Sequence, residues 1–222
     1  MPFIGITELM RRKKAREEAT AQPEYQKLIQ PINRMEVGWG YKNKAYSQYM
    51  ERTWGKPYKH YGADYWGENT IWSCGSGVVY DAGYDSTFGN IVIVKYPNCL
   101  NHVTGKVQNL VVSYRHLARI NVRKGQKVTK DTRIGIMGHT GKFAGSKSHL
   151  HLQVHTDWDH PNWETGIYST NMLRWCSYDS TINPADVLYT KRSAPDCQSV
   201  RTASGYDYTE GSPSSEWTFP MI

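Results

Sequence analysis

Two histidines in a strand-like segment, His149 and His151, are the natural starting point for a search for reactive groups in this sequence. In a strand, residues i and i+2 point to the same face, so both imidazoles would project together from one rigid element. Such a pair is suited to binding a metal ion, although two histidines on the wet face of a strand also occur by chance. Taken alone, the pair leaves both a metal site and an ordinary polar face open.

Two further elements favour the metal site. His60 and Asp64 lie four residues apart, and Gly62 between them permits a tight backbone. Zinc accepts imidazole and carboxylate ligands. His116 ends another strand-like segment and precedes the glycine-punctuated hairpin that leads to the histidine pair. The three elements together predict a metal centre.

In this order the elements resemble the signature of the lysostaphin-like zinc endopeptidases, which is HxGxD, then a histidine in a Tyr-x-His-Leu context, then HxH. The correspondence spans residues 58–188 and includes further segments at 89–93, 122–128, 134–141 and 183–184. Several spaced motifs in the correct order make the resemblance specific.

The resemblance implies that His60, Asp64 and His151 bind one Zn²⁺ per chain, while His116 and His149 are catalytic and stand beside the zinc-bound water. Three protein ligands leave the fourth position of tetrahedral zinc open for water, as a catalytic site requires. Zinc can lower the pKa of that water to about 7 and polarise the scissile carbonyl. Imidazoles can move protons and stabilise the oxyanion, but the sequence does not divide these roles between the two histidines.

The segments that position these residues read as β-strands. Five segments rich in β-branched and aromatic residues are bounded by turn residues, at 77–80, 90–96, 110–114, 133–137 and 150–154. Their short spacing favours antiparallel hairpins. We therefore expect a mainly β fold, an antiparallel sheet with a substrate groove across it and zinc at the floor of the groove.

The chain divides into three parts. Residues 1–37 are expected to form a charged N-terminal arm, in which residues 7 to about 30 read as a charged helix and Pro23 limits regular helix to the first part. Residues 38–190 are expected to form the peptidase domain, which starts with irregular loops over 38–65, because that segment is dense in Gly and Tyr and lacks helical periodicity. Residues 191–222 read as a polar C-terminal tail.

A long aromatic-rich loop is inserted in the domain at residues 157–181. Trp158, Trp163 and Trp175 in this loop are candidates for substrate binding, as one wall of the groove that stacks on sugar or peptide. The alternative is that these aromatic side chains only pack the loop onto the sheet.

Composition limits the wider interpretation. The 222 residues suffice for one well-buried core with appendages, so we expect one catalytic unit. A formal net charge of +7 and a pI near 9.1 favour loose association with polyanions. No window reaches transmembrane length, and no export signal is visible. The four cysteines are too widely spaced for a CxxC zinc knuckle, and their pairing is left open.

We therefore expect a zinc-dependent endopeptidase that hydrolyses peptide bonds of bacterial peptidoglycan stems or cross-bridges through a zinc-bound water. Without an export signal, the chain is expected to be made in the cytoplasm and to act on the wall after release or as part of a virion. The basic arm and polar tail favour a bacteriophage enzyme, either an endolysin or a virion component, whose termini bind phage tail or other virion proteins.

Two other accounts compete with this one. The chain is alternatively a non-enzymatic, zinc-containing module for cell-wall binding or virion assembly, although the five key positions are all retained. Nucleic-acid binding rests on charge alone and has no motif behind it.

Overall fold

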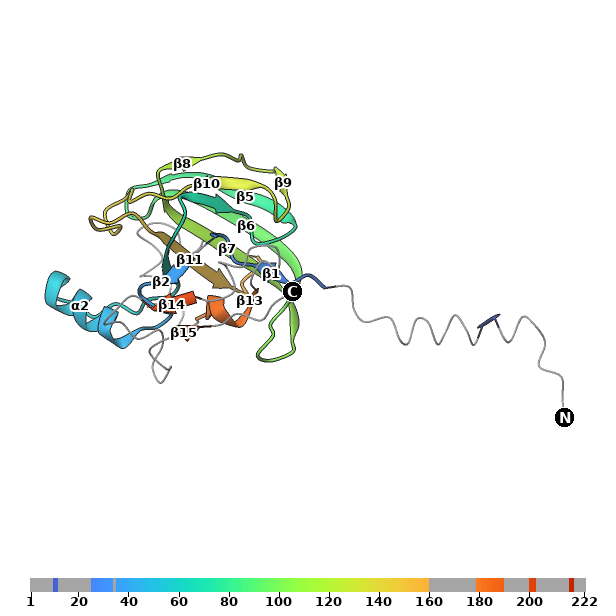
Figure 1. Ribbon diagram of the computed structural model, residues 1–222, viewed down its shortest axis with the longest axis horizontal. Helices are drawn as coiled ribbons and strands as arrows, with labels where there is room; N and C mark the ends of the chain where they lie inside the picture. Colours follow the sequence, from blue (N-terminus) through green and yellow to red (C-terminus); the bar gives the residue numbers. More distant parts are fainter. Residues whose placement is uncertain are drawn as a thin grey trace.

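The computed structural model describes residues 10–11, 25–33, 35–159, 179–189, 200–202 and 216–217 of the chain. This part of the chain forms a mainly β fold with one large sheet, two small sheets and the α-helix α2 (Lys44–Trp54) at one side (Figure 1). The mainly β prediction is confirmed.

The large sheet has the strand order β15-β14-β2-β3-β11-β7-β6-β5-β9, and β12 also pairs with β11. Its strands are β2 (Glu36–Val37), β3 (Ala63–Trp66), β5 (Gly77–Asp85), β6 (Gly89–Leu100), β7 (Val107–Leu117), β9 (Lys127–Val128), β11 (Leu150–His155), β12 (Thr181–Ile182), β14 (Val200–Thr202) and β15 (Glu216–Trp217). A second sheet has the order β4-β10-β8, with β4 (Thr70–Trp72), β8 (Arg119–Ile120) and β10 (Arg133–Ile136). The third pairs β1 (Leu28–Ile29) with β13 (Leu188–Tyr189), which follows the 3₁₀-helix η1 (Pro184–Asp186).

The five predicted strands lie in β5, β6, β7, β10 and β11. The central pairs β5–β6, β6–β7, β7–β11 and β11–β3 are all antiparallel, as the short spacing predicts. Parallel pairing is found between β1 and β13 and between β14 and β2. The antiparallel expectation therefore holds for the strands that carry the predicted site.

Side chains alternate between the two faces of the central strands. One face packs into the main core, which the large sheet shares with Ile71 of β4 and Ile134 of β10. The core-facing residues of β6, β7 and β11 include Val92, Val94, Val112, Tyr114, Leu150 and Leu152. His151 and Arg115 are paired across β11 and β7 and lie on the opposite face. The period of two thus separates the apolar core from the candidate site.

Helix α2 corrects the prediction of irregular loops over 38–65. The Asn43 side chain caps the helix by accepting a hydrogen bond from the Tyr46 backbone N–H at 2.8 Å. Gly55 ends the helix at φ 73°, a left-handed conformation that glycine adopts without a Cβ clash. The prediction was wrong because these two caps, both present in the sequence, were overlooked.

The end of the predicted helical arm also differs from expectation. Residues 28–29 form β1 and residues 36–37 form β2, and both are part of the folded unit. Leu28, Ile32 and Met35 are buried in the main core. Of the earlier part of the arm, the structure describes Met10 and Arg11, which are helical, and residues 1–9 and 12–24 lie outside the described residues. The folded unit therefore begins before residue 38.

Candidate metal centre

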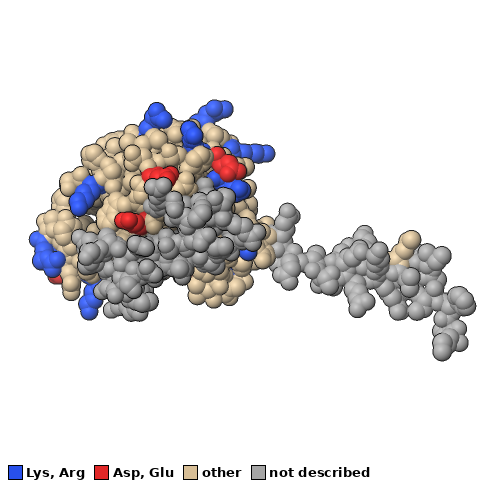
Figure 2. All heavy atoms as spheres, in the orientation of Figure 1, with Lys and Arg blue, Asp and Glu red and all other residues tan. Residues whose placement is uncertain are grey.

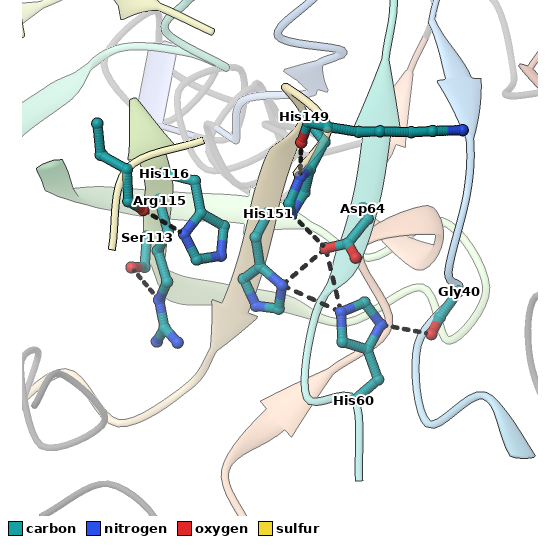
Figure 3. Close-up of polar contacts among 10 residues, drawn as sticks. Gly40, His60, Asp64, Ser113, Arg115, His116, His149 and His151 are labelled. Carbon is teal, nitrogen blue, oxygen red and sulfur yellow. Dashed lines mark hydrogen bonds and ion pairs between the residues drawn. The ribbon is translucent and has the colours of Figure 1, made fainter. Parts of the chain in front are cut away.

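Three side chains meet where β3 and β11 pair. Asp64 of β3 and His151 of β11 are opposite each other in the antiparallel register. His60 precedes β3, and its ring reaches the same point, as Figure 3 shows. The Asp64 Oδ1 atom lies 3.1 Å from His60 Nε2 and 2.9 Å from His151 Nδ1. The two ring nitrogens are 3.1 Å apart. The three predicted ligands are thus brought together.

This donor set fits zinc. Tetrahedral ligands at about 2.0–2.1 Å from zinc are separated from one another by about 3.3–3.4 Å, close to the separations of these three atoms. His60 Nδ1 donates to the Gly40 carbonyl oxygen at 2.8 Å, which leaves Nε2 as the nitrogen with a free lone pair. Two imidazole nitrogens and a carboxylate oxygen that converge on one point can all be satisfied by a single cation.

The electrostatics of the three side chains also suit a cation. Burial raises the pKa of Asp64, but the neighbouring His60 and His149 rings and the hydrogen bonds from His151 and His60 hold this pKa well below its ordinary value. Burial lowers the pKa of His151 to about 4. At neutral pH the carboxylate is therefore charged and the His151 ring is neutral, which are the protonation states that metal ligands need.

Gly62, between the first two ligands, leaves no room for a side chain. A Cβ at this position would lie 2.4 Å from the Leu152 carbonyl oxygen and 2.7 Å from His151 Nε2. The glycine of the HxGxD pattern is thus explained by the close approach of the β3 and β11 backbones.

The two predicted catalytic histidines lie beside the three ligands. His116 Nδ1 donates to the Thr140 carbonyl oxygen and His149 Nδ1 to the Lys147 carbonyl oxygen, both at 2.9 Å. Their ring centroids are 4.9 Å apart, and His149 Nε2 is 3.8 Å from Asp64 Oδ1. In both rings, donation from Nδ1 leaves Nε2 as the nitrogen with a free lone pair.

His116 is also held in an uncommon conformation. Its φ is 64°, which a non-glycine residue rarely adopts and which concentrates at functional sites. Burial lowers the pKa of this ring to about 3, so His116 is neutral at neutral pH.

The five residues form the floor of a cleft of about 890 Å³. We call these five residues the floor, namely His60, Asp64, His116, His149 and His151. The helical wall comprises Trp39 and one face of α2, namely Tyr46, Tyr49, Met50, Thr53 and Trp54, and the loop wall comprises residues 142–148. Glu36, Trp66 and Phe88 complete the lining. The expected groove with a metal site at its floor is therefore present.

The aromatic residues of the helical wall are not those that the sequence indicated. Trp158 is absent from the lining of the cleft and packs against Ile91, Ile93 and Val111, with Lys95 Nζ 4.2 Å from its ring centroid. This is the packing role that was the alternative for the insertion. Trp163 and Trp175 lie outside the described residues. The signal for the helical wall was the helical spacing of residues 46, 49, 50, 53 and 54.

One group of basic residues lies away from the cleft. Exposed Lys and Arg side chains on the segment from β8 to β10 are Arg119, Arg123, Lys124, Lys127, Lys130 and Arg133. Figure 2 shows such side chains along the upper edge of the molecule, where Figure 1 places these strands. None of them lines the cleft. In the described part of the chain, no helix has the length and apolar character needed to cross a bilayer.

Comparison with known proteins gives matches to peptidases. Residues 58–163 match the model of Peptidase family M23. Over 105 residues the chain is 31% identical to the peptidoglycan DD-endopeptidase ShyC of Vibrio cholerae serotype O1. The aligned segment makes up 46% of this chain and 22% of ShyC. The peptidoglycan DD-endopeptidase ShyA of the same organism is 33% identical over 84 residues, or 38% of this chain and 17% of that protein. The chain thus spans about a fifth of the length of these relatives.

The fold also occurs in a solved structure of another kind. A chain of the SpoIIQ–SpoIIIAH pore-forming complex matches with a TM-score of 0.50 and 18% identity, over 74% of this chain and 92% of that chain. At this identity the likeness concerns the fold alone.

Proposed function

We propose that this chain, which carries a domain of Peptidase family M23 at residues 58–163, is a zinc-dependent endopeptidase that hydrolyses peptide bonds in bacterial peptidoglycan stems or cross-bridges. The observation that carries the proposal is the convergence of His60 Nε2, Asp64 Oδ1 and His151 Nδ1 on the floor of an open cleft. The names of the two Vibrio relatives support the substrate. A bacteriophage setting stays a prediction of the sequence alone.

The three converging side chains would hold the metal. When bound, zinc supplies Lewis acidity toward the scissile carbonyl and a nucleophilic water at neutral pH. Asp64 contributes the negative charge of the site, and its neighbours keep it ionised. His60 is oriented by its hydrogen bond to Gly40, so that one nitrogen alone is presented to the centre.

The two remaining histidines, His116 and His149, are the groups for proton transfer. Hydrolysis of a peptide bond requires a proton to be taken from the attacking water and a proton to be given to the departing amine. The Nε2 atoms of His116 and His149 carry a free lone pair and lie on the cleft floor. Once protonated, either ring can also donate a hydrogen bond to the developing oxyanion. We assign both histidines to proton transfer and oxyanion stabilisation as a pair.

The test is the release of new amino groups from purified peptidoglycan by the full chain. Cleavage should stop with a chelator and return with added zinc, and mass analysis of the fragments would identify the bond. Walls with different cross-bridges should be compared, because the bond type is open. Absence of cleavage from every wall type, with one zinc bound per chain, would contradict the proposal.

A second candidate function is a non-enzymatic assembly module that keeps the fold. It is favoured by the fold-level likeness to a chain of a pore-forming complex. All five floor residues are retained, including the two histidines proposed for proton transfer. This retention favours the endopeptidase over the assembly module.

A further inference from the structure

The amphipathic face of α2 points into the cleft. Tyr46, Tyr49, Met50, Thr53 and Trp54 are spaced as i, i+3, i+4, i+7 and i+8, which places them on one side of the helix, and all five line the cleft. Such a face usually packs on the core, yet Met50 is the only buried residue of α2. Tyr49 and Trp54 are 44% and 47% exposed. An exposed aromatic surface that continues a catalytic cleft is suited to binding.

Two groups of contacting aromatic rings line the cleft, and one of them starts at the metal centre. The Tyr46 ring lies 4.3 Å from the His60 ring, centroid to centroid. Trp39 contacts Tyr46 edge-on and stacks with Tyr49 at 5.8 Å and 27°. At the far end, Trp54 meets Phe143 of the loop wall edge-on at 5.7 Å. The helical wall therefore offers flat apolar surface both beside the floor and at Trp54, eight residues further along α2 than Tyr46.

The length of the helical wall matches a short peptide. Tyr46 and Trp54 are eight residues apart, which corresponds to about 12 Å along the helix axis. An extended peptide covers about 3.3–3.6 Å per residue, so three to four residues span that distance. In peptidoglycan a stem peptide of a few residues joins the cross-linked bond to a sugar. A stem whose bond lies at the floor would therefore bring its sugar to the outer half of the helical wall.

The chemistry of the two walls agrees with such a ligand. Tyr and Trp rings combine flat apolar faces with a polar edge, which suits the mixed apolar and hydroxylated surface of a sugar ring. On the loop wall, Lys142 and Lys147 supply positive charge, and Lys142 Nζ is 5.6 Å from the Trp54 ring centroid. Stem peptides carry carboxylates, so this charge is complementary to the peptide part.

Building on the proposed function, we infer that Trp39, Tyr49 and Trp54 form a subsite for the sugar end of a peptidoglycan stem. The enzyme then selects stems that are still attached to glycan over free peptides. These residues precede the segment 58–163 that matches the family model, so the selectivity is a property of this chain and not of the matched domain.

The test compares two substrates with the zinc-loaded full chain: cross-linked stem peptides that carry their disaccharide, and the same peptides without sugar. Wild type should prefer the sugar-bearing substrate in kcat/KM. Trp54→Ala should lower that preference about tenfold, since one aromatic contact to the sugar is lost. Tyr49→Ala should act in the same direction, and Trp54→Phe should restore most of the preference.

Tyr84→Ala is the matched control. Tyr84 is 69% exposed on β5 and does not line the cleft, so its loss should leave kcat/KM for both substrates unchanged. Equal losses on both substrates with Trp54→Ala, or no loss on either, would overturn the sugar subsite.

Binding separates this inference from the proposed function. If wild type cleaves neither substrate, the endopeptidase proposal fails, but calorimetric titration with the disaccharide–tetrapeptide and the sugar-free tetrapeptide still tests the subsite. Tighter binding of the disaccharide form, reduced about tenfold by Trp54→Ala, is the expected result. Equal affinities for the two ligands would refute the subsite.

Discussion

The floor and the helical wall of the cleft are built in different ways. The floor residues sit on or beside paired strands and are nearly buried, with exposed fractions of 3% for His60, 6% for Asp64 and 9% for His151. In the helical wall, by contrast, Tyr49 and Trp54 are almost half exposed, and α2 buries one residue.

The difference agrees with the roles that we propose for the two regions. Metal ligation and proton transfer require atoms to be held within about 0.5 Å of the productive geometry, and paired strands provide that precision. Recognition of a polymer requires an accessible surface, which an exposed helix provides. The floor should therefore respond to substitution through metal content and turnover, and the wall through selectivity.

The largest effect is expected for Asp64→Asn. The variant removes the one anionic ligand, and the affinity for zinc should fall by more than about 100-fold, since loss of an outer partner alone costs about 10–100-fold. Elemental analysis should find little zinc, and wall hydrolysis should be lost. For wild type, zinc at about 100 times its Kd should add about 2.7 kcal/mol to the free energy of unfolding. A zinc-replete, active Asp64→Asn enzyme would remove this residue from the ligand set.

His149→Ala should separate catalysis from metal binding. The ring contributes a proton-transfer group and no ligand atom, so kcat should fall about 10²–10⁴-fold while zinc stays near one per chain. Elemental analysis and steady-state kinetics on the same preparation would check this. Loss of zinc from the variant would make His149 a ligand and contradict its assigned role.

Gly62→Ala tests the close packing beneath the floor. The added Cβ would lie 2.4 Å from a backbone oxygen of Leu152, and the strain should lower the free energy of unfolding by about 1–3 kcal/mol. Gly83→Ala is the matched control in a strand, because no atom lies within 4 Å of its Cβ position. Urea unfolding of both variants gives the comparison, and equal stabilities would refute the steric explanation.

The floor could be predicted from the sequence because local spacing encodes it. The period of two in a strand places His149 and His151 on the same face, and the HxGxD pattern supplies two ligands four residues apart. The register that sets Asp64 opposite His151 joins segments 87 residues apart, and residue spacing alone does not contain it. The resemblance to a known family supplied that part.

The wall and the start of the domain were harder to predict for different reasons. The capping residues and the helical spacing that indicate α2 are local signals, but the Tyr and Gly residues around them suggested loops. The apolar face of α2 lines a cleft, and that cleft exists only after the chain has folded. Leu28 and Ile29 form a strand of two residues that pairs with Leu188 and Tyr189, and such a short, distant pairing has no periodic signature. Tertiary contacts decided both cases.

Asn43→Ala should loosen the wall without disturbing the floor. Loss of the side-chain cap costs about 1 kcal/mol, which should accelerate amide hydrogen exchange in α2 about fivefold. Zinc content should stay near one per chain. Asn183→Ala is the matched control, because Asn183 caps η1 through the Ala185 N–H and should leave exchange in α2 unchanged. Equal acceleration in both variants would show that the effect is global.

The smallest effect concerns the ion pair at the base of the wall, where Lys42 Nζ lies 2.7 Å from Asp179 Oδ2. Burial raises the pKa of Asp179, but hydrogen bonds from Lys42 and Thr181 outweigh it and hold this pKa below its ordinary value. A depressed folded-state pKa stabilises the fold above the unfolded pKa, and this stability is lost as pH falls through the folded value. Asp179→Asn should therefore cost about 0–1 kcal/mol at pH 7 and progressively less in acid.

Urea unfolding of wild type and Asp179→Asn across this pH range measures that difference. Asp131→Asn is the control, because the Lys130–Asp131 pair is longer, at 3.6 Å, and both of its side chains are more than half exposed. If the difference in the free energy of unfolding between wild type and Asp179→Asn does not change with pH, packing accounts for it and not the ion pair. The wall would then be anchored by the Tyr41 hydroxyl, which donates to the Thr181 carbonyl oxygen at 2.9 Å.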